Sequence, residues 1–235
     1  MQIQILEFVG GAINAQGLTV IIDVFRAFSL EAFLFNQGAK KVIPVADVNE
    51  AFALKKSNKD FILIGERLEK KVPGFDFGNS PTAIKDYDFS NKTFVHTTSA
   101  GTLGLVNAMN ASEIITGSFV NISAIIQYIK DKNPKMVSLV AMGFRAESTA
   151  DEDILCAQYI KNELEGKSNN FKIMVATIKM GTGARFFDPI NKLHSPPSDF
   201  DLCLEINKFS FVIKAERIKD KIELRKIPVN INCND

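Results

Sequence analysis

The sequence predicts an α/β fold in which helices cover both faces of a mixed, largely parallel sheet and a β-hairpin lies near the C-terminus. Short apolar runs alternate with segments whose apolar residues recur at helical spacing, which is the pattern of repeated strand–helix units. The stretch 209–229, FSFVIKAERIKDKIELRKIPV, instead alternates apolar and polar residues. Two half-buried strands joined near Lys219 and Asp220 would show that period.

The first strand–helix unit is expected directly after the N-terminal segment. The apolar run 18–22 reads as a strand. Leu30, Phe33 and Leu34 then lie on one helical face, and Gly38 supplies a C-terminal stop for that helix.

Further units follow along the chain. The run 40–46 reads as a strand, and Asp47 and Glu50 have the spacing of a capping box at the start of the next helix. Four more strand-like runs cover 60–67, 92–98, 112–117 and 134–143.

Beyond Gly166 the pattern is weaker. One more helical face is formed by Phe171, Met174, Val175 and Ile178. No repeat or low-complexity linker divides the chain, so we expect one domain over residues 1–235.

Composition restricts the class of partner. The chain has 235 residues, 28 Lys and Arg against 27 Asp and Glu, and a net charge of +1. This balance gives no extended field for nucleic acid or an anionic membrane. No run approaches the ~20 apolar residues of a membrane helix, and the segment 1–17 lacks the basic start of a signal peptide. We expect a cytoplasmic protein without nucleic-acid or membrane partners, and a homo-oligomeric state is left open.

The three cysteines are Cys156, Cys203 and Cys233. Their odd number and wide spacing fit neither a disulfide framework nor a zinc site. Cys156 and Cys203 are expected to be buried and inert.

Polar residues gather after the predicted strands, and ligands of open α/β sheets bind beyond the carboxyl ends of the strands. Asp23 and Arg26 follow the first strand, and Glu66 and Arg67 end the run 60–67. The other candidates are polar, charged or small residues that follow later strands or begin helices: Asn79, Ser80, Thr98, Ser99, Gly101, Thr102, Asn121, Arg145, Glu152 and Asp153. We expect these residues to meet at one edge of the sheet.

Acids and arginines together suit a phosphate monoester that is bound through a divalent cation. Carboxylates alone would repel the ester, and arginines alone would not activate it. The ligands of the cation are expected among Asp23, Glu66, Glu152 and Asp153, with Asp23, Glu152 and Asp153 as the predicted set. Asp23, Arg26 and Glu66 are the predicted catalytic residues.

The predicted substrate site combines arginines with small polar residues. Arg26 and Arg67 would bind the phosphate and the acid groups of a small substrate. The segment 98–102 would hold an anion through its amide N–H groups and hydroxyls at a helix start. Asn79, Ser80 and Asn121 complete the predicted substrate-binding set.

Several phosphate-handling motifs do not occur. There is no GxxxxGK[ST] loop, and GTGARF at Gly181 lacks the third glycine of a dinucleotide fingerprint, so it reads as a flexible turn. Neither Cys156 nor Cys203 is followed six positions later by arginine, which a cysteine phosphatase would need. Phe25 stands two positions after Asp23, where a haloacid-dehalogenase phosphatase has a second aspartate.

The motifs IDVFRAFS, GER, GFDFGNSP, TSAGT, GSFVN, DEDILCA and DFDLC occur in this order over nearly the whole chain. Together they resemble the 2-phosphosulfolactate phosphatases. The resemblance implies a three-layer α/β/α fold, dependence on magnesium, and hydrolysis of 2-phospho-3-sulfolactate to 3-sulfolactate and phosphate during coenzyme M synthesis. One segment departs from that family, because its usual TTNGT is TSAGT at 98–102.

Structural roles compete with these functional ones. Asp23 and Arg26 could form an ion pair that only braces the strand end, although at an open rim Arg26 should support little of the core. Asn121 could cap the following helix. Glu152 has capping-box spacing from Thr149, and both Glu152 and Asp153 would suit the dipole of a helix start.

The histidines and the type of reaction also allow more than one interpretation. His96 lies within an apolar strand and reads as a core or rim residue, whereas His194 sits in a proline-rich loop. The same scaffold could bind a small phosphorylated or sulfonated acid without turnover, or act as a lyase or transferase on a related acid. Carboxylates beside the arginines argue against simple anion binding, since without a metal they would weaken it.

Overall fold

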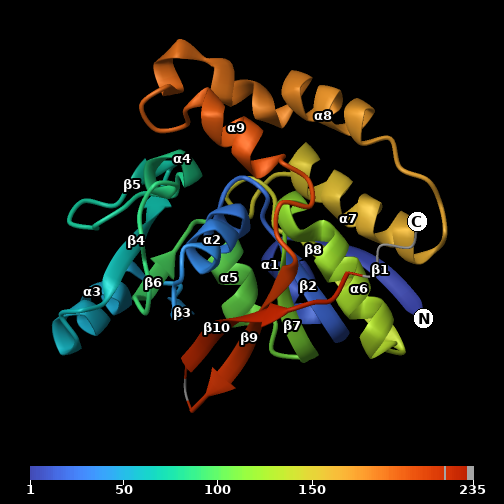
Figure 1. Cartoon of the computed structure of the whole chain (residues 1–235), viewed down its shortest axis with the longest axis horizontal. Helices are drawn as coiled ribbons and strands as arrows, with labels where there is room; N and C mark the ends of the chain where they lie inside the picture. The colour runs from blue at the N-terminus through green and yellow to red at the C-terminus, as the bar shows by residue number, and fades with distance from the viewer. Residues whose placement is uncertain (220, 232–235) are drawn as a thin grey trace.

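The computed structural model describes residues 1–219 and 221–231, so Asp220 and Cys233 lie outside the described residues. The strands are β1 (Gln2–Glu7), β2 (Gly17–Ile22), β3 (Lys41–Pro44), β4 (Ile62–Arg67), β5 (Lys70–Lys71), β6 (Thr93–Thr97), β7 (Ala111–Gly117), β8 (Met136–Ala141), β9 (Phe211–Ile218) and β10 (Lys221–Pro228) (Figure 1). The α-helices are α1 (Phe8–Asn14), α2 (Ala27–Asn36), α3 (Val48–Ser57), α4 (Pro81–Ile84), α5 (Gly101–Asn107), α6 (Ile122–Lys132), α7 (Asp151–Leu164), α8 (Phe171–Met180) and α9 (Pro197–Cys203). Three short 3-10 helices are η1 (Phe119–Asn121), η2 (Thr182–Phe187) and η3 (Pro189–Asn191).

The strands form one mixed sheet in the order β1-β8-β2-β7-β9-β10-β3-β6-β4-β5. The strands β1, β8, β2 and β7 pair in parallel, and so do β3, β6 and β4. The C-terminal hairpin joins these two blocks, because β9 pairs antiparallel with β7 and β10 pairs antiparallel with β3. The predicted α/β class, the largely parallel sheet and the hairpin are confirmed.

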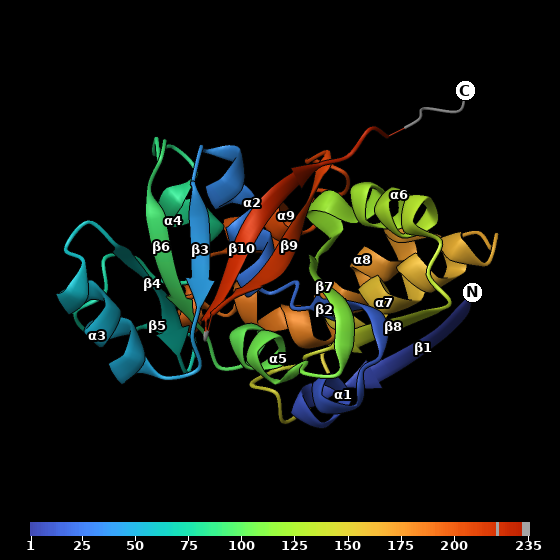
Figure 2. The same cartoon turned by 90° about the horizontal axis from the view of Figure 1, so that it is seen from below.

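Alternating residues of β2 pack on opposite faces of the sheet, as the two-residue period of a strand requires. Ile21 packs in one core cluster with Leu105 of α5. Val20 packs in another cluster with Ile125 of α6 and Ile160 of α7. Figure 2 shows α1 and α5 on one side of this block of strands and α6 and α7 on the other.

The local start and stop signals act largely as predicted. The Asp47 carboxylate accepts the N–H of Asn49, which caps α3. Gly38 has a φ of 90°, the left-handed conformation of a residue that ends a helix. The strand β1 was not expected, because Gln2 and Gln4 interrupt its apolar residues; it is an edge strand paired only with β8 among the described residues.

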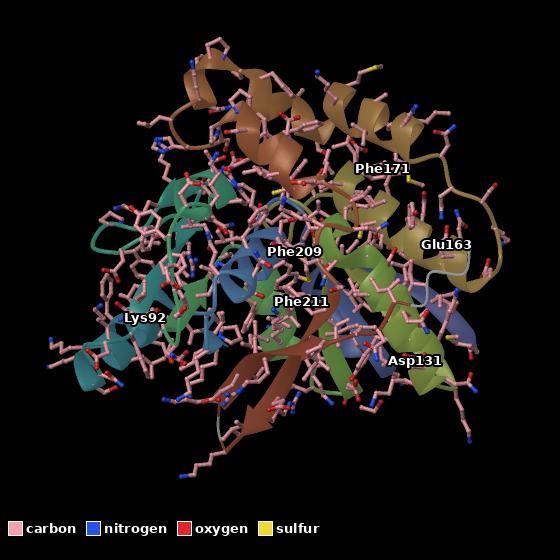
Figure 3. All side chains as sticks on the ribbon, in the orientation of Figure 1. Lys92, Asp131, Glu163, Phe171, Phe209 and Phe211 are labelled. Atoms are coloured by element: carbon pink, nitrogen blue, oxygen red, sulfur yellow. The ribbon has the colours of Figure 1, made fainter. Side chains whose placement is uncertain are left out.

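The segment between α7 and β9 leaves the sheet and covers one end of the molecule with α8, η2, η3 and α9 (Figure 1). It returns to the core through Phe209 and Phe211, whose rings stack with centroids 5.5 Å apart (Figure 3). Phe209 also contacts Phe33 of α2 edge-on at 5.2 Å. None of the helices described here has the length and apolar character needed to cross a membrane.

Candidate active site

The loops after β2, β4, β6 and β8 meet around a small cavity of about 30 Å³. Its lining combines acids, arginines and small residues: Asp23, Phe25, Arg26, Glu66, Glu69, Asn79, Ser99, Ala100, Gly143, Phe144, Arg145, Glu152 and Arg185. This volume holds one or two water molecules. The predicted convergence of acids and arginines is therefore present, around a small pocket that is partly open to solvent.

Asp23 follows β2 and is held by the backbone on both carboxylate oxygens. Oδ1 accepts the N–H of Ala27 at 3.1 Å, and Oδ2 accepts the N–H of Gly101 at 2.9 Å. A Cβ on residue 101 would lie 2.8 Å from Oδ2, so this approach needs glycine. Burial raises the pKa of Asp23 to about 6, the N–H of Ala27 opposes that rise, and the charge of Glu66 adds to it.

Asp153 lies at the start of α7 and binds the backbone in the same way. Its two oxygens accept the N–H groups of Val24 at 2.8 Å and Gly143 at 2.9 Å, so it joins the loops after β2 and β8. Burial, together with the charges of Asp23 and Glu152, raises the pKa of Asp153 well above its usual range. Asp153 does not line the cavity but stands behind Asp23.

Glu66 and Arg67 point in opposite directions, as neighbours in a strand must. Glu66 faces the cavity and accepts the N–H of Ser99 at 2.7 Å. Arg67 faces away and donates to the carbonyl oxygen of Ala46 and the hydroxyl of Thr97, both at 2.8 Å. Arg67 is thus outside this cavity, and the phosphate-binding role expected of it has no support from its position.

Glu152 is 2% exposed and faces the cavity. Its oxygens bind the hydroxyl of Thr182 and, at 3.3 Å, the guanidinium of Arg185. The capping-box interpretation of Glu152 is wrong: α7 has Ala150 at its N-cap, and the Thr149 hydroxyl bonds elsewhere. Tertiary contacts with η2 have replaced the local cap.

Arg26 does not pair with Asp23. Its Nη1 donates to Asp199 Oδ2 and to the carbonyl oxygen of His194, both at 2.7 Å. Arg26 is 4% exposed and Asp199 is fully buried, so the expectation of an open rim is also wrong. Arg26 still lines the cavity, and no bond from its Nε or Nη2 is found among the described residues. Arg26 therefore stabilises the fold through its buried ion pair and also places a positive charge at the cavity.

Threonines in the segment 98–102 bond mainly to each other. Thr98 N donates to Thr102 Oγ1 at 2.9 Å, and Thr102 N donates to Thr98 Oγ1 at 3.2 Å. The N–H groups of Ser99 and Gly101 are occupied by Glu66 and Asp23. The segment that was predicted to bind a substrate anion thus uses these amides to orient the carboxylates of Glu66 and Asp23. Of the four residues Thr98, Ser99, Gly101 and Thr102, Ser99 alone lines the cavity.

The remaining predicted residues separate into two groups. Asn79 lines the cavity, whereas Ser80 lies beside it and donates to Asp199 Oδ1 at 2.9 Å. Asn121 is distant from the cavity lining and donates to the carbonyl oxygen of Phe211 at 3.1 Å. Asn121 occupies the N-cap position of α6, as its structural interpretation predicted, although its side chain makes no capping hydrogen bond there.

Arg185 was not selected from the sequence. The GTGARF segment that read as a flexible turn forms η2, and Arg185 extends from it into the cavity. Its guanidinium lies 5.5 Å, 5.2 Å and 5.1 Å from the ring centroids of Phe25, Phe144 and Phe186. Asp199 was also overlooked, although the motif DFDLC begins with it. Neither residue follows a predicted strand, which was the signal that selected Asp23, Arg26 and Glu66.

The buried histidine and cysteines lie outside the cavity lining. His96 is fully buried and its Nδ1 lies 2.8 Å from Glu31 Oε1, which fits the expected core position. Cys156 and Cys203 are buried and free, as predicted, and burial raises the pKa of each thiol.

The carboxylates at the cavity suit a magnesium ion that keeps some of its water ligands better than a metal ion whose ligands all come from the protein. Within residues 1–219 and 221–231, no three His, Cys, Asp or Glu side chains form a group that could hold a metal. Magnesium, however, usually keeps several waters and uses one or two carboxylates together with substrate phosphate. Asp23, Glu66 and Glu152 line the cavity, and the charges of neighbouring acids raise the pKa of Asp23 and Asp153, a repulsion that a cation would relieve.

The raised pKa of Asp23 predicts that the metal-free protein loses stability as the pH rises. Asp23 binds its proton more tightly in the folded chain than in the unfolded chain, so folding is favoured by acid between pH 3.8 and about 6. A pKa shift of this size corresponds to a change of about 3 kcal/mol in the free energy of unfolding. Urea unfolding with a chelator present at pH 4 and pH 7 measures the change. The Asp23→Asn variant should lose that part of the pH dependence; an unchanged dependence would remove Asp23 as its cause.

Comparison with known proteins places the chain in a family. The family model of 2-phosphosulpholactate phosphatase matches residues 5–217. A protein of Caldanaerobacter subterraneus subsp. tengcongensis is 39% identical over 219 residues, which cover 84% of this chain and 87% of that protein. A Bacillus subtilis protein is 32% identical over 206 residues (85% and 87%), and a Thermoplasma volcanium protein is 33% identical over 209 residues (89% and 93%). All three are named probable 2-phosphosulfolactate phosphatase. The chain therefore belongs to the 2-phosphosulpholactate phosphatase family, and with that family it is a phosphoric monoester hydrolase.

Proposed function

We propose that this protein hydrolyses 2-phospho-3-sulfolactate to 3-sulfolactate and phosphate in a magnesium-dependent reaction. The observation that supports it most directly is the small cavity that is lined by Asp23, Glu66 and Glu152 together with Arg26 and Arg185. The names of the relatives supply the substrate. Coenzyme M synthesis and a cytoplasmic location stay predictions.

The arginines provide the anion-binding part of the proposed site. Arg26 is fixed through Nη1 by Asp199 and His194, which leaves Nε and Nη2 for phosphate oxygens. Arg185 is held by aromatic rings and by Glu152, so its guanidinium is already at the cavity. Two guanidinium groups can neutralise the charge that develops on phosphate during transfer.

The acids provide the second part. Asp23, with both oxygens fixed by backbone N–H groups, is the carboxylate that we assign to the reacting end of the ester. One or two of the acids that line the cavity, Asp23, Glu66 and Glu152, would hold magnesium together with the substrate phosphate. Asp153 orients the loops around them. When bound, magnesium would neutralise phosphate charge and lower the pKa of a bound water. Excluding bulk water from so small a cavity would strengthen all these interactions.

Removal of the metal tests this proposal. Phosphate release from 2-phospho-3-sulfolactate should fall to background after exhaustive chelation, and added magnesium should restore it, because four acids around one cavity would otherwise repel the ester. Dialysis against chelator followed by a phosphate-release assay measures both steps. Undiminished turnover after chelation would exclude the metal.

The same assay distinguishes hydrolysis from the binding, lyase and transferase functions that the sequence also allows. A binding protein would hold the ester but release no phosphate, whereas a lyase or transferase would consume it with a different product. The acids fixed at the cavity favour hydrolysis over simple binding, because without a metal they would oppose an anion.

A further inference from the structure

A second, larger cavity of about 310 Å³ adjoins the inner one. The two share Glu69 and Asn79 in their walls. The outer cavity lies between the region of β5 and α4 and the loop that leads from η3 into α9, at one end of the molecule in Figure 1.

The boundary between the cavities is an ion pair. Arg185 Nε lies 3.1 Å from Glu69 Oε1, at an angle that gives no hydrogen bond. Ser195 Oγ donates to the same oxygen at 3.4 Å, which is a long contact. These loose contacts are easily exchanged for contacts with an anion, since a bound phosphate or sulfonate offers Arg185 a better geometry.

The inner cavity is much smaller than the outer one. Its volume of about 30 Å³ is one tenth of the 310 Å³ next to it. A small phosphate ester that places its phosphate between Arg26 and Arg185 would find most room for its carbon chain past Glu69, in the outer cavity.

The outer cavity presents positive charge. Lys71 and Lys192 line it, and neither takes part in an ion pair among the residues that the structure describes. His194 also lines the outer cavity. Glu69 is the one acidic residue in the lining, and it is already paired with Arg185. Two free ammonium groups at such a wall suit an anionic group on the ligand.

Asn79 supplies an independent sign of a ligand. Its side chain is 6% exposed, and its Oδ1 has no hydrogen-bond partner in the described part of the chain. A buried amide oxygen without a partner is unfavourable unless a ligand or water donates to it. The acid groups of the ester only accept hydrogen bonds, so the donor to Asn79 Oδ1 would be a water that bridges to the ester. Because Asn79 lines both cavities, that water would lie at their boundary.

We infer that the outer cavity binds the acid groups carried by the carbon chain of the substrate, with Lys71 and Lys192 as residues that determine specificity for an anionic ester. This inference rests on the proposed function for the phosphate end of the substrate. It predicts discrimination between esters that carry a second acid group and neutral esters of similar size.

Binding of the product tests the inference without turnover. The double variant Lys71→Ala/Lys192→Ala should bind 3-sulfolactate about tenfold or more weakly in calorimetry, because two charge-assisted contacts are lost. The control variant Lys56→Ala/Lys92→Ala removes two exposed lysines from other surfaces and should bind like the wild type. Equal affinity in all three proteins, or no binding by the wild type, would overturn the inference.

Turnover gives a second, separate test. With 2-phospho-3-sulfolactate the Lys71→Ala/Lys192→Ala variant should show a raised KM and kcat/KM lowered by about tenfold or more. With glycerol 2-phosphate, whose arms are neutral, its kinetics should match those of the wild type. An equal loss with both esters, or none with either, would overturn the inference. If the wild type hydrolyses neither ester, the proposed function fails, and the calorimetric comparison still decides the role of the lysines.

Discussion

Replacement of Asp23 by asparagine is expected to lower the rate of phosphate release by ~100-fold or more, the scale of one lost preorganised electrostatic contact in an active site. The change keeps the shape of the side chain and removes its charge. It also places an amide N–H next to the backbone N–H of Ala27 or Gly101, each of which now donates to a carboxylate oxygen. Phosphate-release kinetics at saturating magnesium measure the effect.

A matched control lies on α9. Asp201 is exposed, so Asp201→Asn makes the same chemical change away from the cavity and should leave the kinetics unchanged. Near-normal turnover in folded Asp23→Asn protein would return Asp23 to a structural role, as an acceptor that joins α2 to α5.

Arg26→Ala is expected to reduce both stability and catalysis. The substitution leaves the fully buried carboxylate of Asp199 without its cation, and breaking a buried pair in this way costs about 3–5 kcal/mol of unfolding free energy. Catalysis should fall as well, because the guanidinium lines the cavity. Arg26→Lys should keep part of the stability, since it retains the charge but not the planar fork.

A double variant separates the two effects. Arg26→Ala/Asp199→Asn removes the unpaired buried charge, and the asparagine Oδ1 can still accept from Ser80 and Thr82, so most of the lost stability should return. Phosphate release should remain low, because the cavity still lacks Arg26. Chemical denaturation and phosphate-release kinetics on both variants measure the two effects. Arg225 pairs with Glu223 on the hairpin, so Arg225→Ala serves as the control. Near-normal kinetics in the double variant would make Arg26 a brace alone.

Local sequence patterns determined the fold class. The apolar runs gave the central strands because β2, β6 and β8 are buried on both faces, so they appear as continuous hydrophobic stretches. The hairpin was visible because apolar and polar residues alternate in its sequence. Its burial follows that alternation only in part, since β9 is buried at its start and exposed at its end. The edge strand β1 was missed, since its glutamines weaken the signal and its pairing with β8 bridges residues far apart in sequence.

The sequence also identified three of the four acids that line the cavity, Asp23, Glu66 and Glu152, but not Glu69. Asp23 and Glu66 stand at the ends of strands, where chain direction alone places them at the carboxyl edge. The alternation of strand residues predicted that the side chains of Glu66 and Arg67 would point in opposite directions, but not which of them would face the cavity. That choice depends on the N–H of Ser99, which belongs to another loop.

Tertiary structure alone decided which partners the arginines have and what shape the cavity takes. Arg185 and Asp199 reach the site on the segment between α7 and β9, whose path depends on packing against α4 and α7 rather than on any local pattern. The pairing of Arg26 with Asp199 instead of Asp23 also depends on tertiary structure, because Asp199 is 173 residues away in the sequence. Local patterns report periodicity and strand ends, whereas such long-range pairs arise only when packing brings distant loops together.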